Sequence, residues 1–251
     1  MMKKNHTPYI LECCVDSTAS AIQAKKGGAH RLELCSNLVI GGTTPSMALF
    51  RKIREYADLP VHALIRPRYG DFLYSQAELE QMAMEIDMFR TVGAEGIVIG
   101  CLTADGSLDT EAMQLLMQHA GSMHVTLHRA FDMCRDPFRT LQEAISLGIR
   151  TILTSGCQPS CLQGIDLLSQ LAEKADNRIS IMAGAGINQA AVRLLLEQTS
   201  ITAFHMSGKR IRESRMQYRT PRISMGIPGM SEYELLETDS EAVAAVRRLL
   251  S

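Results

Sequence analysis

The sequence alternates short apolar runs with longer stretches whose apolar residues recur at helical spacing, and it does so eight times. Short runs bounded by turn residues are typical of buried strands, whereas a 3.6-residue period is typical of amphipathic helices. The eight predicted strands are Tyr9–Val15, Arg31–Leu34, Val61–Ile65, Gly96–Ile99, Val125–His128, Thr151–Thr154, Ile179–Ala183 and Ala203–Met206. Eight strand–helix units favour a (β/α)8 TIM barrel built on a closed parallel sheet.

An open, doubly wound sheet would show the same alternation and is the alternative fold. Its nucleotide-binding form is disfavoured, because no Gly-x-Gly-x-x-Gly follows the first predicted strand. Predicted helices include Gln76–Val92, Pro137–Leu147 and Gln189–Glu197, and several helices end at a glycine, the residue favoured just after a helix. We therefore expect the barrel.

The residues after the eighth predicted strand do not continue the alternation of strands and helices. We expect one domain over residues 1–251, in which a barrel core (1–208) carries a C-terminal extension (209–251) packed on it. Residues 209–237 of the extension contain five arginines, and Asp239 or Ser240 can cap a last helix over Glu241–Leu250. Three interpretations of the arginines remain open: a solvated face, a contact with a partner subunit, or a contact with an anionic ligand.

Composition excludes several classes of function. The formal net charge is −1 and aromatic residues make up 5% of the chain, with no tryptophan, so we expect no nucleic-acid partner. No apolar run is long enough to cross a bilayer, and the N-terminal residues lack the apolar region of a signal peptide. We expect no membrane partner. Seven cysteines, an odd number, fit reduced thiols in the cytoplasm better than a disulfide framework.

Strand alternation predicts which side chains point into the barrel. The outer face of each strand packs on helices and should be apolar, so Glu12, Cys14, Arg31, Glu33 and Cys35 should face the lumen. Buried carboxylates need a cation, a shared proton or an arginine. The two glutamates and the arginine could form a purely structural network, or they could belong to a catalytic or metal-binding lumen.

Polar residues also follow several other predicted strands. By alternation Arg66, His128, His205 and Ser207 face inward, and Arg129 and Asp132 come directly after the fifth strand. In a TIM barrel these strand ends meet at the C-terminal face, where active sites are built. We predict that Glu12, Glu33, Arg66, His128 and His205 cluster at one mouth of the barrel.

Two glycine-containing turns follow the seventh and eighth strands. One contains Gly184 and Gly186, and the other is Ser207-Gly208-Lys209. Turns of this kind expose backbone N–H groups, and in barrels this position often holds phosphate. They are candidates for binding a phosphate or a carboxylate, although each can also be a simple turn.

The cysteines show no zinc-binding spacing. Cys14 and Cys35 occupy equivalent positions in Glu-x-Cys motifs on neighbouring strands, so their thiols could lie close together. Two soft thiolates suit Cu(I). Free cysteines are also common as small buried apolar residues, and spacing does not separate the two interpretations.

These motifs resemble the CutC family, named for copper homeostasis, along essentially the whole chain. The matching segments are Leu11–Ser17, Arg31–Ser36, Gly41–Ser46, Ile65–Arg68, Gly70–Ser75, His128–Asp132, Leu153–Cys157, Phe204–His205 and Ser231–Glu234. The resemblance implies a cytoplasmic TIM barrel, often oligomeric, that binds copper or confers copper tolerance. It implies that Cys14 and Cys35 ligate Cu(I). The family has one cysteine in the first-strand motif; Cys13 is an additional one, predicted to face the helices.

We therefore expect a cytoplasmic copper-homeostasis protein, assembled as a homodimer or homotetramer, that binds Cu(I) at Cys14 and Cys35. The alternative is an acid–base enzyme acting on a small anionic, possibly phosphorylated, metabolite. In that interpretation Glu12 or Glu33 is the base and His128 or His205 the acid. The predicted anion clamps are Arg66, Arg68 and Arg129, and the predicted anion-binding turns are Gly184–Gly186 and Ser207–Lys209. A third interpretation, an inactive barrel that serves as an assembly scaffold, leaves the buried charges unexplained.

Overall fold

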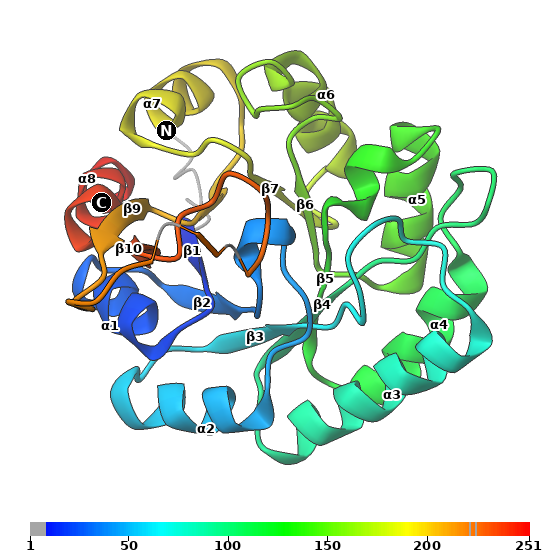
Figure 1. Ribbon diagram of the computed structural model, residues 1–251. Coiled ribbons are helices and arrows are strands. Elements are labelled where there is room, and N and C mark those ends of the chain that lie inside the picture. Colours follow the sequence, from blue (N-terminus) through cyan, green and yellow to red (C-terminus); the bar gives the residue numbers. More distant parts are fainter. Residues whose placement is uncertain (1–8, 221, 224) are drawn as a thin grey trace.

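The computed structural model describes residues 9–220, 222–223 and 225–251. Eight parallel strands pair in sequence order, and the last pairs with the first, so that the sheet closes into a barrel (Figure 1). The barrel strands are β1 (Ile10–Val15), β2 (Arg31–Leu34), β3 (Val61–Leu64), β4 (Gly96–Ile99), β5 (His124–Leu127), β6 (Thr151–Thr154), β7 (Ser180–Ala183) and β8 (Ala203–Met206). The predicted (β/α)8 TIM barrel is confirmed, and each strand lies within one or two residues of its predicted bounds.

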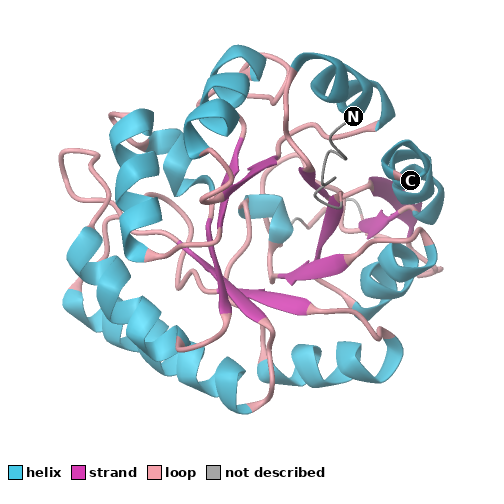
Figure 2. Ribbon diagram, turned by 180° about the vertical axis from the view of Figure 1, so that it is seen from behind, coloured by secondary structure: helices cyan, strands magenta, loops and turns pink. Residues whose placement is uncertain are grey.

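Helices surround the strands on the outside, as the view from behind shows (Figure 2). They are α1 (Thr18–Lys26), α2 (Met47–Tyr56), α3 (Gln76–Thr91), α4 (Thr110–Ala120), α5 (Pro137–Leu147), α6 (Ile165–Ala175), α7 (Gln189–Gln198) and α8 (Ser240–Arg247). Most begin at a side-chain cap; Ser75 and Glu78, for example, form a reciprocal capping box on α3. The large apolar core fills the layer between these helices and the outer faces of the strands.

The register of β1 fixes what faces the lumen. Glu12 lies opposite Arg31 on β2 and opposite His205 on β8, and Cys14 lies opposite Glu33. Cys13 is buried in the apolar layer against the helices. Cys14 instead belongs to a lumen cluster with Cys35, Leu64 and Val98. The predicted faces of the first two strands are therefore confirmed.

The C-terminal extension contains more structure than the sequence indicated. Strands β9 (Lys209–Glu213) and β10 (Glu234–Thr238) form a separate antiparallel pair, which was not predicted. Asp239 caps α8 as expected. The Thr238 N–H donates to Ser20 Oγ at 3.2 Å, and α8 packs against α1, so the extension is anchored on the barrel. Within the described residues no helix has the length and apolarity needed to cross a membrane.

Candidate functional site

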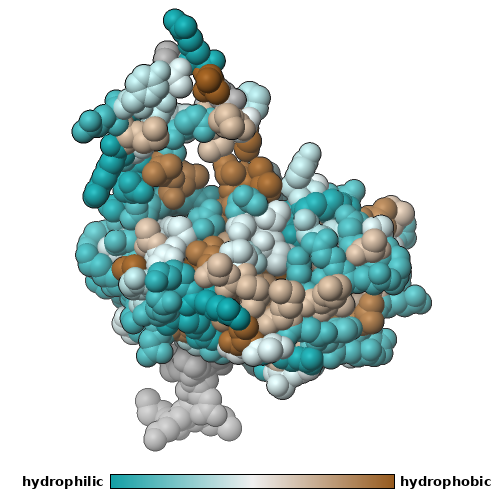
Figure 3. All heavy atoms as spheres, turned by 60° about the horizontal axis from the view of Figure 1, so that its bottom comes forward, coloured by the Kyte–Doolittle hydropathy of each residue, from teal (hydrophilic) through white to brown (hydrophobic). Residues whose placement is uncertain are grey.

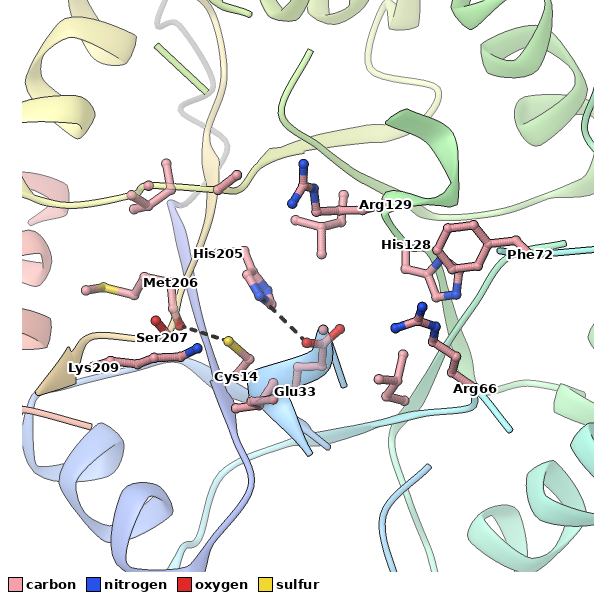
Figure 4. Close-up of a pocket in the computed structure, with 17 residues that line it drawn as sticks. Cys14, Glu33, Arg66, Phe72, His128, Arg129, His205, Met206, Ser207 and Lys209 are labelled. Atoms are coloured by element: carbon pink, nitrogen blue, oxygen red, sulfur yellow. Dashed lines mark hydrogen bonds and ion pairs between the residues drawn. The ribbon is translucent and has the colours of Figure 1, made fainter. Parts of the chain in front are cut away.

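A pocket of about 310 Å³ opens at the C-terminal mouth of the barrel (Figure 4). This volume is at the lower end of the range of small-molecule sites. Its walls come from β1, β2, β3, β6 and β8, from the loops after β2, β3, β5, β7 and β8, and from the start of β9. The lining residues are Cys14, Glu33, Leu38, Gly41, Leu64, Arg66, Phe72, His128, Arg129, Leu153, Ala185, Gly186, Ile187, His205, Met206, Ser207 and Lys209.

The centre of the pocket is a cluster of Cys14, Glu33 and His205. One ligand atom from each, the sulfur, a carboxylate oxygen and an imidazole nitrogen, lies within 4.8 Å of the other two. His205 Nε2 is 3.6 Å from a Glu33 oxygen, and the Cys14 thiol points towards the Met206 carbonyl oxygen at 3.7 Å. A thiol, an imidazole and a carboxylate are the groups that ligate transition metals.

Glu12 lies one layer beneath this cluster and is fully buried. Its carboxylate accepts a hydrogen bond from His205 Nδ1 at 2.7 Å and another from Arg31 Nε at 2.5 Å. Burial works to raise the pKa of Glu12, but Arg31 and His205 together hold it well below its usual value. Glu12 is thus a carboxylate that fixes the orientation of His205 and does not itself line the pocket.

Glu33 and His205 at the centre of the pocket both have shifted pKa values, and each affects the other. Burial is the largest influence on both groups. It raises the pKa of Glu33, whereas for His205 it is outweighed by Cys14 and Glu33, which raise the imidazole pKa well above its ordinary value. The Cys35 thiol is fully buried beside them, 3.4 Å from Glu33 Oε2, and burial raises its pKa well above the usual value.

Arg66, Phe72 and His128 form a second wall, on one side of the central cluster in Figure 4. The Arg66 guanidinium donates to the carbonyls of Gly42 (3.0 Å) and Gly70 (2.8 Å) and lies 5.0 Å from the centre of the Phe72 ring. His128 Nδ1 accepts from the Ala130 N–H at 3.1 Å. Burial, followed by the charge of Arg66, lowers the pKa of His128 to about 3.

The structure does not bring all predicted site residues to the pocket. Asp132 instead accepts hydrogen bonds from Thr154 Oγ1, from the backbone N–H of Cys157 at 3.1 Å and from Arg129 Nε at 2.7 Å. It therefore ties the loop after β5 to the loop after β6. Arg129 lines the pocket while paired with this aspartate.

The predicted anion-binding residues divide in the same way. Gly186, Ser207 and Lys209 line the pocket, whereas Gly184 and Gly208 shape the turns behind it. Gly208 has a φ of +55°, in the left-handed region that favours glycine. Arg68 lies outside the pocket, where it pairs with Asp71 at 2.9 Å and with Glu78 at 2.5 Å.

Sequence reasoning missed two groups of polar or aromatic residues. Phe72 reaches the pocket from a long loop, and no strand pattern could place it there. His62 and His124 lie deeper in the lumen, with ring centres 4.8 Å apart, and His62 Nδ1 is 4.0 Å from Glu12. His62 could have been found, because it has the same parity as Arg66 along the third strand.

Comparison with known proteins identifies the family to which this sequence belongs. The sequence model of the CutC family matches residues 9–210. A human copper homeostasis protein cutC homolog is 44% identical over 96% of this chain and 88% of its own length. A CutC family protein from Porphyromonas gingivalis is 44% identical over 93% of this chain and 94% of its own. The crystal structure of CutC from Streptococcus agalactiae superposes with a TM-score of 0.76 at 29% identity, covering 79% of this chain and 98% of the other. Because the family match spans the barrel and the relatives extend beyond it, this chain belongs to the CutC family.

Proposed function

We propose that this protein acts in copper homeostasis by binding Cu(I) at the centre of the barrel mouth. The observation that carries the proposal is the cluster in which ligand atoms of Cys14, Glu33 and His205 all lie within 4.8 Å of one another. Cu(I) is a soft cation that prefers thiolate, with imidazole as a further ligand. Cys14 Sγ and His205 Nε2 are the first two ligands in this proposal.

Glu12 gives His205 the orientation that a metal ligand needs. A ligating histidine usually donates its other ring N–H to a carboxylate, which fixes the tautomer and makes the free nitrogen more basic. The 2.7 Å hydrogen bond from His205 Nδ1 to Glu12 has this form, and it leaves Nε2 facing Cys14 and Glu33. The buried network beneath the pocket thereby supports the proposed copper ligand.

Cys35 is the second thiolate of the proposed site. It belongs to the same lumen cluster as Cys14 but does not line the pocket, so the proposal requires its thiol to turn towards the ion. Its thiol must lose a proton to bind copper. The Glu33 carboxylate, 3.4 Å from Cys35 Sγ, is close enough to take that proton. Glu33 offers an oxygen ligand, which suits Cu(I) poorly. We therefore propose that Glu33 accepts the proton from Cys35 and does not ligate the ion.

The names of the relatives agree with this proposal. Both the human relative and the Streptococcus agalactiae relative are named for copper homeostasis. All seven cysteines of the chain are free thiols. Reduced thiols and Cu(I) both belong to a reducing compartment, so we propose that the protein works in the cytoplasm.

A titration with Cu(I) against a competing chelator, under anaerobic conditions, tests the site. Cys14→Ala and Cys35→Ala should each lose the tight equivalent of copper bound by the parent chain. Cys13→Ala is the matched control, because Cys13 directly precedes Cys14 on the same strand but faces the helices. If Cys14→Ala binds copper as tightly as Cys13→Ala, the site assignment is wrong.

An acid–base enzyme acting on a small anion is the second candidate function. The observation that favours it is the pair of Glu33 and His205, 3.6 Å apart in a pocket large enough for a metabolite, with the pKa of each raised above its ordinary value. Such a pair can hold a proton and pass it to a bound molecule. In this function Glu33 is the base and His205 the acid, and the thiols are not needed.

We further propose that the protein assembles as a homo-oligomer, a dimer or a tetramer, through its C-terminal extension. Figure 3 shows apolar side chains gathered along the part that projects from the body. The exposed apolar residues of the extension are Ile211, Met216, Tyr218, Ile223, Met225, Ile227, Met230, Leu235 and Leu236. Exposed apolar side chains gathered in one region are typical of an interface. A second copy suits it, because a net charge of −1 produces little repulsion between copies.

A further inference from the structure

Arg66 carries a positive charge that the described part of the chain does not neutralise. The residue is 7% exposed, and no carboxylate among the described residues forms a salt bridge with it. Its two terminal nitrogens donate to backbone carbonyls, and its Nε–H has no partner. A buried charge without a counter-ion is costly, and so is a buried donor without an acceptor.

His128 presents a second unused donor on the same wall. It is 5% exposed, and its Nδ1 already accepts a hydrogen bond from Ala130. The proton of the neutral ring therefore lies on Nε2, which has no partner. Gly100 makes room for this ring, because a Cβ there would come within 2.6 Å of it. The backbone is thus shaped to hold the imidazole at the pocket wall.

Arg66 and His128 both line the same side of the pocket. Figure 4 shows Arg66 and His128 side by side with Phe72, on the side of the pocket away from Ser207 and Lys209, with Glu33 and His205 between the two sides. The Phe72 ring contacts both, at 5.0 Å from the guanidinium carbon and 4.8 Å from the imidazole centre. Both side chains are therefore held in place before any ligand arrives, so that little is lost in ordering them.

We propose that this wall, formed by Arg66, His128 and Phe72, is a binding site for the carboxylate of a small organic acid. A carboxylate supplies the single negative charge and the two acceptor oxygens that the guanidinium and the neutral imidazole lack. A phosphate dianion would bring a second charge that this wall does not match. The inference rests on the second candidate function, because the wall lies in the same pocket, and it names the class of anion; it uses none of the proposed copper ligands.

Glycolate is the probe for the test, at constant ionic strength with sodium chloride. The parent protein, labelled with ¹⁵N at histidine, should show a saturable shift of the His128 Nε2 signal. Arg66→Met should weaken glycolate binding roughly tenfold or more, the loss of a charge-assisted hydrogen bond. Arg139→Met is the control, since Arg139 is exposed on α5, where it pairs with Glu143 outside the pocket, and it should bind glycolate like the parent.

Arg66→Lys keeps the charge but not the planar donor, and it covers the case in which Arg66→Met does not fold. It should bind glycolate more weakly than the parent and more tightly than any folded Arg66→Met. No saturable shift in the parent, or equal binding by the parent and Arg66→Lys, would overturn the site. Tighter binding of inorganic phosphate than of glycolate would overturn its assignment to carboxylates. None of these results depends on copper, so the two proposals succeed or fail separately.

Discussion

Glu12 and His205 are joined across the seam where the last barrel strand meets the first, by a hydrogen bond of 2.7 Å from Nδ1 to the carboxylate. Arg31 holds the other carboxylate oxygen, so Glu12 stays ionised although it is fully buried. Arg31, Glu12 and His205 therefore form one hydrogen-bonded unit that reaches from the middle of the lumen to the pocket. The orientation of His205, and with it the proposed copper site, depends on a residue that no ligand touches.

Replacing Glu12 with Gln should weaken Cu(I) binding about 10- to 100-fold, the usual effect of losing the carboxylate behind a ligating histidine. The neutral amide no longer favours the tautomer that leaves Nε2 free. The measurement is a chelator competition at fixed pH. Glu95→Gln serves as the control, because Glu95 pairs with Arg54 at the barrel surface. Parent-like affinity in Glu12→Gln would show that Glu12 does not position the ligand.

The same carboxylate should matter for stability through Arg31. Arg31→Met leaves the buried Glu12 charge without its guanidinium partner and should cost about 3–5 kcal/mol of unfolding free energy. In the double variant Arg31→Met/Glu12→Leu both charges are gone, and the loss should be smaller than in Arg31→Met alone. Urea unfolding of the parent and the variants measures both values. A double variant less stable than Arg31→Met would contradict a pairing in which each charge compensates the other.

Two buried histidines, His62 and His128, and the half-buried His124 predict a loss of stability in mild acid. Burial lowers the pKa of His62 and His128 to about 3 and that of His124 to about 4. Below about pH 6.5 the unfolded chain binds protons at these rings and the folded protein does not, so the free energy of unfolding falls as the pH drops towards 4. His205, whose pKa is raised, gives the opposite trend above pH 6.5, because its stabilising charge is then lost.

Stability should therefore be greatest near pH 6.5, and urea unfolding at half-unit steps from pH 4.5 to 8 would measure the profile. His62→Gln removes one of the three neutral rings and should flatten the acidic side. Glu33, whose pKa is raised, has the opposite effect in this range, and Glu33→Gln removes it; a Glu33→Gln profile that stays level between pH 6.5 and 5 would mean that these histidines are charged in the folded protein.

The apolar surface of the extension predicts a change of assembly. Ile211 and Leu236 are cross-strand neighbours on β9 and β10, and both are exposed. Ile211→Glu should shift a dimer or tetramer to monomer in sedimentation velocity, because it introduces a charge into the proposed interface. Met84→Glu, at an exposed position on α3, is the control and should leave the assembly unchanged. A monomeric parent at micromolar concentration would remove the interface.

The sequence was sufficient for the barrel and for the faces of its strands, because strand side chains alternate with a period of two. That rule placed Cys14 and Glu33 in the lumen and Cys13 against the helices. Parity gives the face of a strand and not the depth along the barrel axis. Glu12 was therefore expected at the mouth with Glu33, whereas it lies one layer below.

Loop geometry could not be predicted either, because the alternation of side chains applies only within strands. Asp132 follows a strand end, but the chain turns there through a 3-10 helix (Arg129–Met133), and the carboxylate binds the neighbouring loop. Strands β9 and β10 are separated by a long segment, and the exposed, charged residues of β9 carry no buried pattern. Their pairing depends on contacts far apart in the sequence, which periodicity does not reveal.

The position of bound copper is the most direct test of the central claim. Crystals loaded anaerobically with one equivalent of Cu(I) and measured at the copper absorption edge would show where the ion lies. We predict one anomalous peak in the barrel mouth, within bonding distance of Cys14 Sγ and His205 Nε2, with Cys35 turned towards it. A peak at any other group of thiols, such as Cys134 and Cys157 on the neighbouring loops, or no peak in the mouth at full loading, would contradict the claim.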